Sequence, residues 1–190
     1  MNENSKRKIE VITLGAALTA LVVVLQLIGA SIRFGTFSVS LVLIPIVIGA
    51  ATCGKYIGAW LGFVFGMAVL LSGDAALFMG ISDYGTIITV LLKGTACGFI
   101  AGLVYELLAK KSKTLGAVAS AIVCPVVNTG IFVLGCFVFF KDFIASGAGN
   151  QNLFIYTITV FVGLNFVFEL LVNLLLCPAV VRIIQVIRKM

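Results

Sequence analysis

The chain has 190 residues, of which 62% are hydrophobic and only 11% are charged, and its formal net charge is +6. This balance excludes an ordinary soluble domain and predicts an integral membrane protein. Its apolar runs are long and unbroken, which favours membrane-spanning helices over a β-barrel of alternating strands.

The basic residues stand at the ends of apolar runs rather than in one patch, so we expect a lipid bilayer as the surrounding medium and no nucleic acid partner. The chain has no histidine, which removes imidazole metal ligands and catalytic triads. Its five cysteines are scattered through apolar runs without a CxxC pair, as expected of packing residues. We therefore expect no metal site and no cofactor.

Six transmembrane helices are predicted, forming an all-α bundle in one domain, residues 1–190. A polar, basic tail at residues 1–9 precedes the first span, Pro45 interrupts the short second span, and residues 141–152 form a loop. The predicted spans are 11–30, 38–52, 55–71, 85–109, 115–140 and 153–181.

The flanking charges predict the orientation of the bundle. Ten of the 13 Lys and Arg residues flank the spans on the side that holds both termini, and two lie on the other side. Because cytoplasmic loops carry the excess of Lys and Arg, both termini are expected to be cytoplasmic.

Small residues recur at every fourth position in three spans, which lets helices approach closely. In the third and fourth spans a ligand against the bare backbone is the alternative interpretation. The residues are Ala16 and Ala20 in the first span, Gly58, Gly62 and Gly66 in the third, and Gly94, Gly98 and Gly102 in the fourth.

Strongly polar residues interrupt three of the apolar spans. Asn165, Glu169 and Asn173 recur every four residues and make one helical stripe. Lys93, Asn128 and Glu169 each lie about 20–25 Å from the cytoplasmic end of their span, at 1.5 Å per residue, so they can converge. Two interpretations stay open: a Lys93–Glu169 ion pair that only stabilises the bundle, and a pocket for a polar small molecule.

The outer loops add four further candidates for substrate binding. Arg33 and Phe34 lie in the first outer loop, and Asp83 and Tyr84 lie before the fourth span. The rings of Phe34 and Tyr84 can stack on a flat ligand. Each of the four is alternatively an interfacial anchor or a solvated charge.

One stretch of the sequence resembles a phosphate-binding loop but lacks two features of such a loop. Residues Gly49–Tyr56 read GAATCGKY and match GxxxxGK, but a phosphate-binding loop needs Ser or Thr next and a strand before it. We expect no nucleotide binding, so any uphill transport by such a protein would have to depend on a partner or on an ion gradient.

The chain resembles the substrate-specific components of energy-coupling factor (ECF) vitamin transporters. The resemblance rests on the AxxxA step at Ala16 and Ala20, on the six spans, and on the block SVSLVLIPIVIGAATCGKYIGAWLGFVFG (Ser38–Gly66). The nearest branch is that of the riboflavin, folate and pantothenate binders. The resemblance implies a multi-pass protein of the bacterial cell membrane that captures a vitamin-like small molecule from outside. It also implies a transmembrane coupling protein that docks on Ala16 and Ala20, two cytoplasmic ATPases, a lid formed by the loop of Arg33, and release of cargo by toppling.

Departures from the family pattern narrow the substrate. Cobalt and nickel binders rely on histidine, and thiamine binders stack their ligand on tryptophan, whereas the single tryptophan, Trp60, lies near the cytoplasmic end of its span. Glu169 beside Asn165 suggests a ligand with hydrogen-bond donors, such as a pteridine, a flavin or an amine-bearing ring. The alternatives are a gradient-driven carrier or channel, and an intramembrane enzyme, for which no recognisable motif is present.

Overall fold

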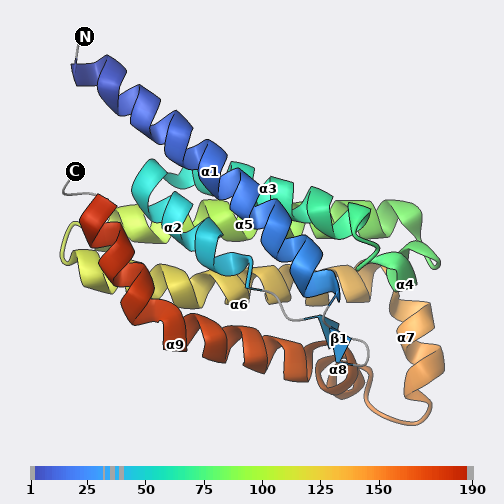
Figure 1. Ribbon diagram of the computed structural model, residues 1–190. Helices are drawn as coiled ribbons and strands as arrows, with labels where there is room; N and C mark the ends of the chain where they lie inside the picture. Colours follow the sequence, from blue (N-terminus) through green and yellow to red (C-terminus); the bar gives the residue numbers. More distant parts are fainter. Residues whose placement is uncertain (1–2, 32, 35–36, 39–40, 188–190) are drawn as a thin grey trace.

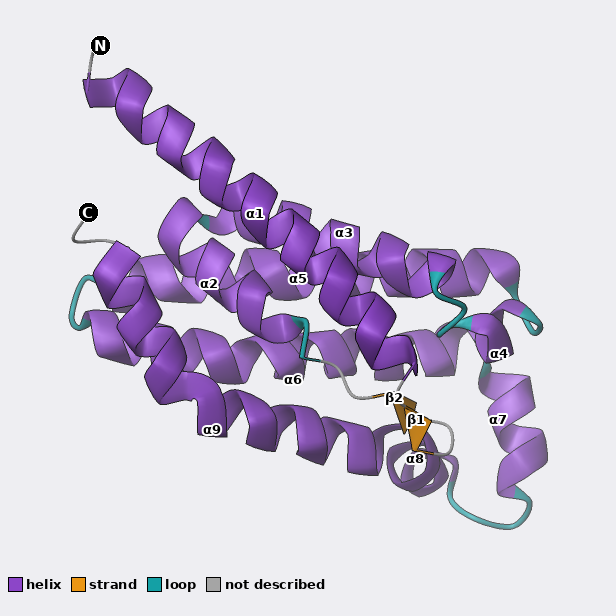
Figure 2. Cartoon of the chain, in the orientation of Figure 1, coloured by secondary structure: helices purple, strands orange, loops and turns teal. Residues whose placement is uncertain are grey.

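The computed structural model describes residues 3–31, 33–34, 37–38 and 41–187 (Figure 1). Helices make up almost all of this part of the chain, beside one short antiparallel hairpin (Figure 2). The longer helices are α1 (Glu3–Ser31), α2 (Leu43–Cys53), α3 (Lys55–Leu71), α5 (Asp83–Leu108), α6 (Lys113–Phe139) and α9 (Gly163–Ile187). The shorter elements are β1 (Arg33–Phe34), β2 (Phe37–Ser38), α4 (Ala76–Met79), α7 (Lys141–Ala148), α8 (Leu153–Tyr156) and the π-helix η1 (Thr157–Val162).

Among the described helices, three are long and apolar enough to cross a membrane: Lys8–Ala30 within α1, then α5 and α6. The chain is thus a helical protein with membrane-spanning segments, as predicted. The 11 residues of α2 rise only about 16 Å, against a hydrocarbon core of roughly 30 Å. The count of six crossings and the cytoplasmic termini therefore stay predictions.

The bundle is built around α5, which packs between α3 and α6. Helix α1 crosses α2 and α3, and α9 packs against α6 and α2. Both termini lie at one end of the bundle together with the α5–α6 turn, whereas the hairpin, α4, α7 and α8 lie at the other end (Figure 1). We call the second end the hairpin end.

The contact between α3 and α5 is a backbone contact. A Cβ atom added at Gly62 would overlap the carbonyl oxygen of Gly94, and one added at Gly94 would overlap the carbonyl oxygen of Gly62. Gly58 and Gly98 meet in the same way one turn along. The predicted tight packing is confirmed, and these glycines face each other rather than a ligand.

Two serine caps explain why α5 and α6 begin two residues earlier than the predicted spans. The Oγ atom of Ser82 accepts a hydrogen bond from the backbone N–H of Gly85 at 3.2 Å. The Oγ atom of Ser112 accepts one from Leu115 at 3.4 Å. Each hydroxyl satisfies an N–H group that has no partner within its helix.

Near the N-terminus, α1 begins earlier than the predicted first span, and two expectations about the second span are wrong. The tail at residues 1–9 is helical from Glu3, and its first turns project beyond the bundle (Figure 1). Ser38 pairs with Arg33 in the hairpin, so α2 begins only at Leu43. Pro45 then falls in the first turn of α2, where its missing N–H removes no helical hydrogen bond, and it does not interrupt the helix.

The predicted loop at residues 141–152 is also wrong in its first part, because α7 occupies Lys141–Ala148. Phe140, Ile144 and Ala148 recur every four residues and are buried together. The ring of Phe140 lies 4.9 Å from that of Phe78, which in turn meets Phe132 at 5.4 Å. This apolar cluster holds α7 against α4 and α6.

Gly62→Ala is expected to lower the stability of the protein by about 1–3 kcal/mol, because overpacking a tight contact pushes two backbones apart. Gly130→Ala is the matched control, since Gly130 is exposed on α6 and a Cβ there meets nothing within 4 Å. That change should be neutral or stabilising by about 0.5–1 kcal/mol. Thermal unfolding in detergent measures both, and equal melting temperatures for the two variants would contradict the backbone contact.

Candidate functional site

Several buried polar side chains of the bundle donate hydrogen bonds to backbone carbonyl groups. Thr86 and Thr157 each donate to the backbone carbonyl group four residues earlier in the chain at 2.8 Å. Ser120 of α6 donates to the Ala101 carbonyl of α5 at 2.8 Å, and Asn173 donates to the Glu169 carbonyl at 2.8 Å. These groups are accounted for as parts of the fold, which leaves a smaller set at the centre.

That set joins three helices. Glu169 of α9 is 4% exposed, and its carboxylate accepts a hydrogen bond from the side chain of Asn128 on α6. Lys93 of α5 is half-buried and acts electrostatically on the same carboxylate. The structure therefore brings the three polar residues of the predicted convergence together in one place.

Lys93 is held between aromatic rings. Its Nζ atom lies 5.4 Å from the ring centroid of Phe132 on α6 and 5.8 Å from that of Phe65 on α3. Ring faces attract a cation, so the ammonium is stabilised without a carboxylate in direct contact. Among the described side chains, a direct ion pair joins Lys55 to Glu106 at 2.9 Å, and none joins Lys93 to Glu169.

Two thiols line the next turn of the same helices, on the side away from the hairpin end. Cys97, one turn after Lys93 on α5, donates to the Gly94 carbonyl at 3.1 Å. Cys124, one turn before Asn128 on α6, shares a hydrogen bond with Cys97 and lies near Glu169. Both are fully buried and free, and within the described chain no group of three or more His, Cys, Asp or Glu residues is placed to hold a metal ion.

The other predicted substrate-binding residues do not join this centre, or are only partly described. Asp83 and Tyr84 are exposed in the first turn of α5, about 15 Å along the helix from Lys93. The side chains of Arg33 and Phe34 in β1, and that of Asn165 in α9, lie outside the described part of the structure.

The predicted docking residues Ala16 and Ala20 are exposed on α1. Leu18 and Val22 face the bundle instead and are buried. Trp60 of α3 lies beside this face, is 52% exposed, and donates its Nε1–H to Thr19 at 3.3 Å. The small-residue face of α1 is thus open on the outside of the bundle.

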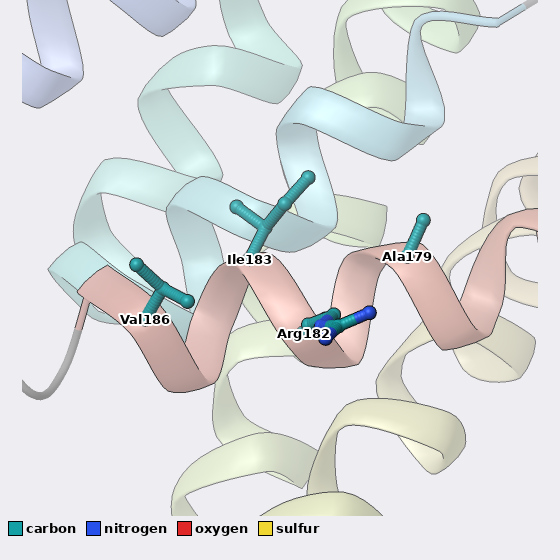
Figure 3. A pocket seen from close by; sticks show the side chains of 4 residues that line it. All are labelled: Ala179, Arg182, Ile183 and Val186. Atoms are coloured by element: carbon teal, nitrogen blue, oxygen red, sulfur yellow. The ribbon is translucent and has the colours of Figure 1, made fainter.

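A shallow apolar pocket lies near the C-terminal end of α9 (Figure 3). Its lining residues are Ala179, Arg182, Ile183 and Val186. Arg182 is 13 residues after Glu169, which corresponds to about 20 Å along the helix, so this pocket is separate from the polar centre.

Sequence reasoning did not single out Thr89, Phe65 and Phe132 as neighbours of the polar centre. Thr89 is 3% exposed, and its hydroxyl has no hydrogen-bond partner. The available signal was its position four residues before Lys93, which places both on one face of α5. The two aromatic residues could not be distinguished from the other 13 phenylalanines of the chain.

Long apolar helices around a buried group of polar side chains define this chain as a membrane-embedded protein with an internal polar site. A family model for the substrate-specific component of ECF transporters matches residues 11–181, and the chain belongs to that family. It is therefore a substrate-binding subunit of a transporter, in a family of transporters rather than enzymes. No curated protein and no solved structure matched.

The electrostatic link between Lys93 and Glu169 predicts coupled effects on stability. Lys93→Met should destabilise the protein by about 1–3 kcal/mol, because it takes away the nearby positive charge that balances a buried carboxylate, without breaking a contact ion pair. Glu169→Gln in the same chain should recover a large part of that loss. Lys55→Met, at the partly exposed pair with Glu106, should cost no more than about 1 kcal/mol.

Melting temperatures of the single and double variants measure this coupling. Strictly additive effects of Lys93→Met and Glu169→Gln would show that the two charges do not interact.

Proposed function

We propose that the protein captures a vitamin or a related small solute from outside the cell and delivers it inward. A transmembrane coupling protein and two cytoplasmic ATPases would drive the transport, in the membrane of a bacterial cell. The carrying observation is the polar centre of Lys93, Asn128 and Glu169 between α5, α6 and α9. A buried ionisable group within a membrane protein is costly and in general marks a functional site.

The arrangement of charges supports ligand binding over a purely structural ion pair. Lys93 rests on two aromatic rings and makes no direct contact with Glu169 among the described side chains. A structural pair would be expected to close to contact, because close approach offsets the cost of removing both ions from water. The separated charges can instead each bind a polar group of a solute.

The side chains also favour the ligand class suggested by the sequence. Glu169 accepts hydrogen bonds, so a solute with N–H or O–H donors, such as a pteridine, a flavin or an amine-bearing ring, matches it. Trp60 lies on the outer surface beside Thr19 and not at the polar centre, which supports the argument against thiamine. We propose that the entrance of the substrate site is formed at the hairpin end by Arg33, Phe34, Asp83 and Tyr84. We propose that Asn165 binds the solute next to Glu169.

The direct test is ligand binding by the purified protein. At least one of riboflavin, folate and pantothenate should raise its melting temperature. Glu169→Gln and Asn128→Ala should each weaken that binding by tenfold or more, since each removes a hydrogen bond worth at least about 1.4 kcal/mol. Glu10→Gln, the same change on the exposed part of α1, is the control and should bind normally. If no vitamin stabilises the wild-type protein, and mass spectrometry finds no small molecule bound to it, the proposal is wrong.

Docking of the coupling protein on α1 gives a second prediction. Ala16→Leu and Ala20→Leu should abolish co-purification with the coupling protein, because leucine keeps the partner helix at a distance. Vitamin binding by the isolated protein should be unchanged. Ala145→Leu, on the exposed side of α7 at the hairpin end, is the matched control. Normal complex formation by both α1 variants would exclude this face as the docking surface.

A further inference from the structure

Two buried oxygen atoms beside the polar centre have no hydrogen-bond partner. They are Oγ1 of Thr89 on α5 and Oδ1 of Asn128 on α6. The two side chains are only 3% and 5% exposed, so water does not satisfy these atoms from the surface. Buried polar atoms in folded proteins are almost always hydrogen-bonded, and a missing partner therefore calls for an explanation.

Thr86 on the same helix shows what a structural threonine does here. It is equally buried, and its hydroxyl donates to the Ser82 carbonyl four residues earlier at 2.8 Å. Thr95, further along α5, donates to Leu91 in the same manner at 2.7 Å. Thr89 makes no such bond, so its hydroxyl stays available to another molecule.

The position of Thr89 is fixed by the facing helix. A Cβ atom added at Gly135 of α6 would overlap both Oγ1 and Cγ2 of Thr89, so the missing side chain of this glycine provides the space for the threonine. Thr89 stands one helical turn from Lys93, on the side of the hairpin end, and Asn128 lies on the other side of the same centre, bonded to Glu169.

We propose that Thr89 is a ligand-contacting residue of the substrate site, and that its hydroxyl and the Asn128 carbonyl bind opposite ends of one net-neutral solute. This inference rests on the proposed function. Oδ1 of Asn128 can only accept, so the solute donates an N–H or O–H there; the Thr89 hydroxyl can donate, so the solute carries an acceptor at its other end.

The helices set the length of this solute. Thr89 precedes Lys93 by four residues, which corresponds to about 6 Å along α5. Thr89 packs against Gly135 of α6, and Asn128 precedes Gly135 by seven residues. Asn128 therefore lies about 10 Å along α6 from the level of Thr89. The donor and the acceptor are thus separated by about the length of two or three fused rings.

The charges around the site set the net charge of the solute. Lys93 and Glu169 already balance each other within the centre. A solute with a net charge would add an uncompensated charge in a medium of low polarity, whereas a neutral one would not. Thr89 and Asn128 are uncharged, so a solute that binds to them needs no formal charge at those positions.

The test uses three vitamins as probes: riboflavin, which is neutral with fused rings, pantothenate, an anion, and thiamine, a cation. Isothermal titration of the detergent-purified full chain should show riboflavin binding at least tenfold more tightly than the other two. Tightest binding of pantothenate or thiamine would overturn the net-neutral solute while leaving the proposed function intact. If none of the three binds, and native mass spectrometry finds no other bound molecule, the proposed function fails together with the inference.

The variants test Thr89 itself. Thr89→Val, which replaces the hydroxyl by a methyl group, should weaken riboflavin binding by about tenfold, and Thr89→Ser, which keeps the hydroxyl, should stay within about threefold of the wild type. Thr86→Val is the matched control and should bind as the wild type does, because that hydroxyl is used within its own helix. Melting temperatures without riboflavin separate binding from folding. Equal riboflavin affinities of a folded Thr89→Val protein and the wild type would overturn the contact.

Discussion

The buried carboxylate of Glu169 is the constraint on which the rest of the bundle depends. A charge in the apolar interior is costly unless neighbouring groups stabilise it, and no single helix supplies those groups. Asn128 comes from α6 and Lys93 from α5, so α9 must pack where it can reach both. The aromatic rings of Phe65 and Phe132 then stabilise Lys93 and bring α3 into the same arrangement. The polar centre around this carboxylate thus links side chains of four helices.

The glycine contact between α3 and α5 makes this arrangement possible. Because the backbones touch at Gly62 and Gly94, the two helices lie closer than side-chain packing would allow. Gly94 directly follows Lys93, so one of these close backbone contacts lies at the level of the polar centre. Phe65 of α3 can therefore reach the Lys93 ammonium from the neighbouring helix.

Long-range polarity and small-residue spacing were readable from the sequence, whereas local backbone geometry was not. The convergence of Lys93, Asn128 and Glu169 followed from their equal depths, because depth along a helix depends only on residue count. The hairpin at Arg33–Ser38 was missed because each of its strands is only two residues long. Helix α7 was missed because its four-residue spacing of apolar residues is short and lies among glycine, alanine and asparagine residues that are typical of a loop. Thr89 was missed for a different reason: its role depends on the absence of a hydrogen bond, and a threonine in an apolar run gives no sign of that absence.

The π-helix before α9 shows how one chain segment can serve two clusters. From Glu169 onward the buried face follows α-helical spacing through Asn173 and Cys177, whereas before it Thr157 and Val162 are buried five residues apart. Five is the spacing of a π-turn, so η1 inserts one residue relative to an α-helix and rotates the preceding segment. Leu153 and Tyr156 can then pack against the apolar cluster of α6 and α7, while Glu169 of α9 stays beside Lys93 and Asn128. An uninterrupted α-helix would satisfy one of these contacts at the expense of the other, which is a physical reason for the insertion at this point of the chain.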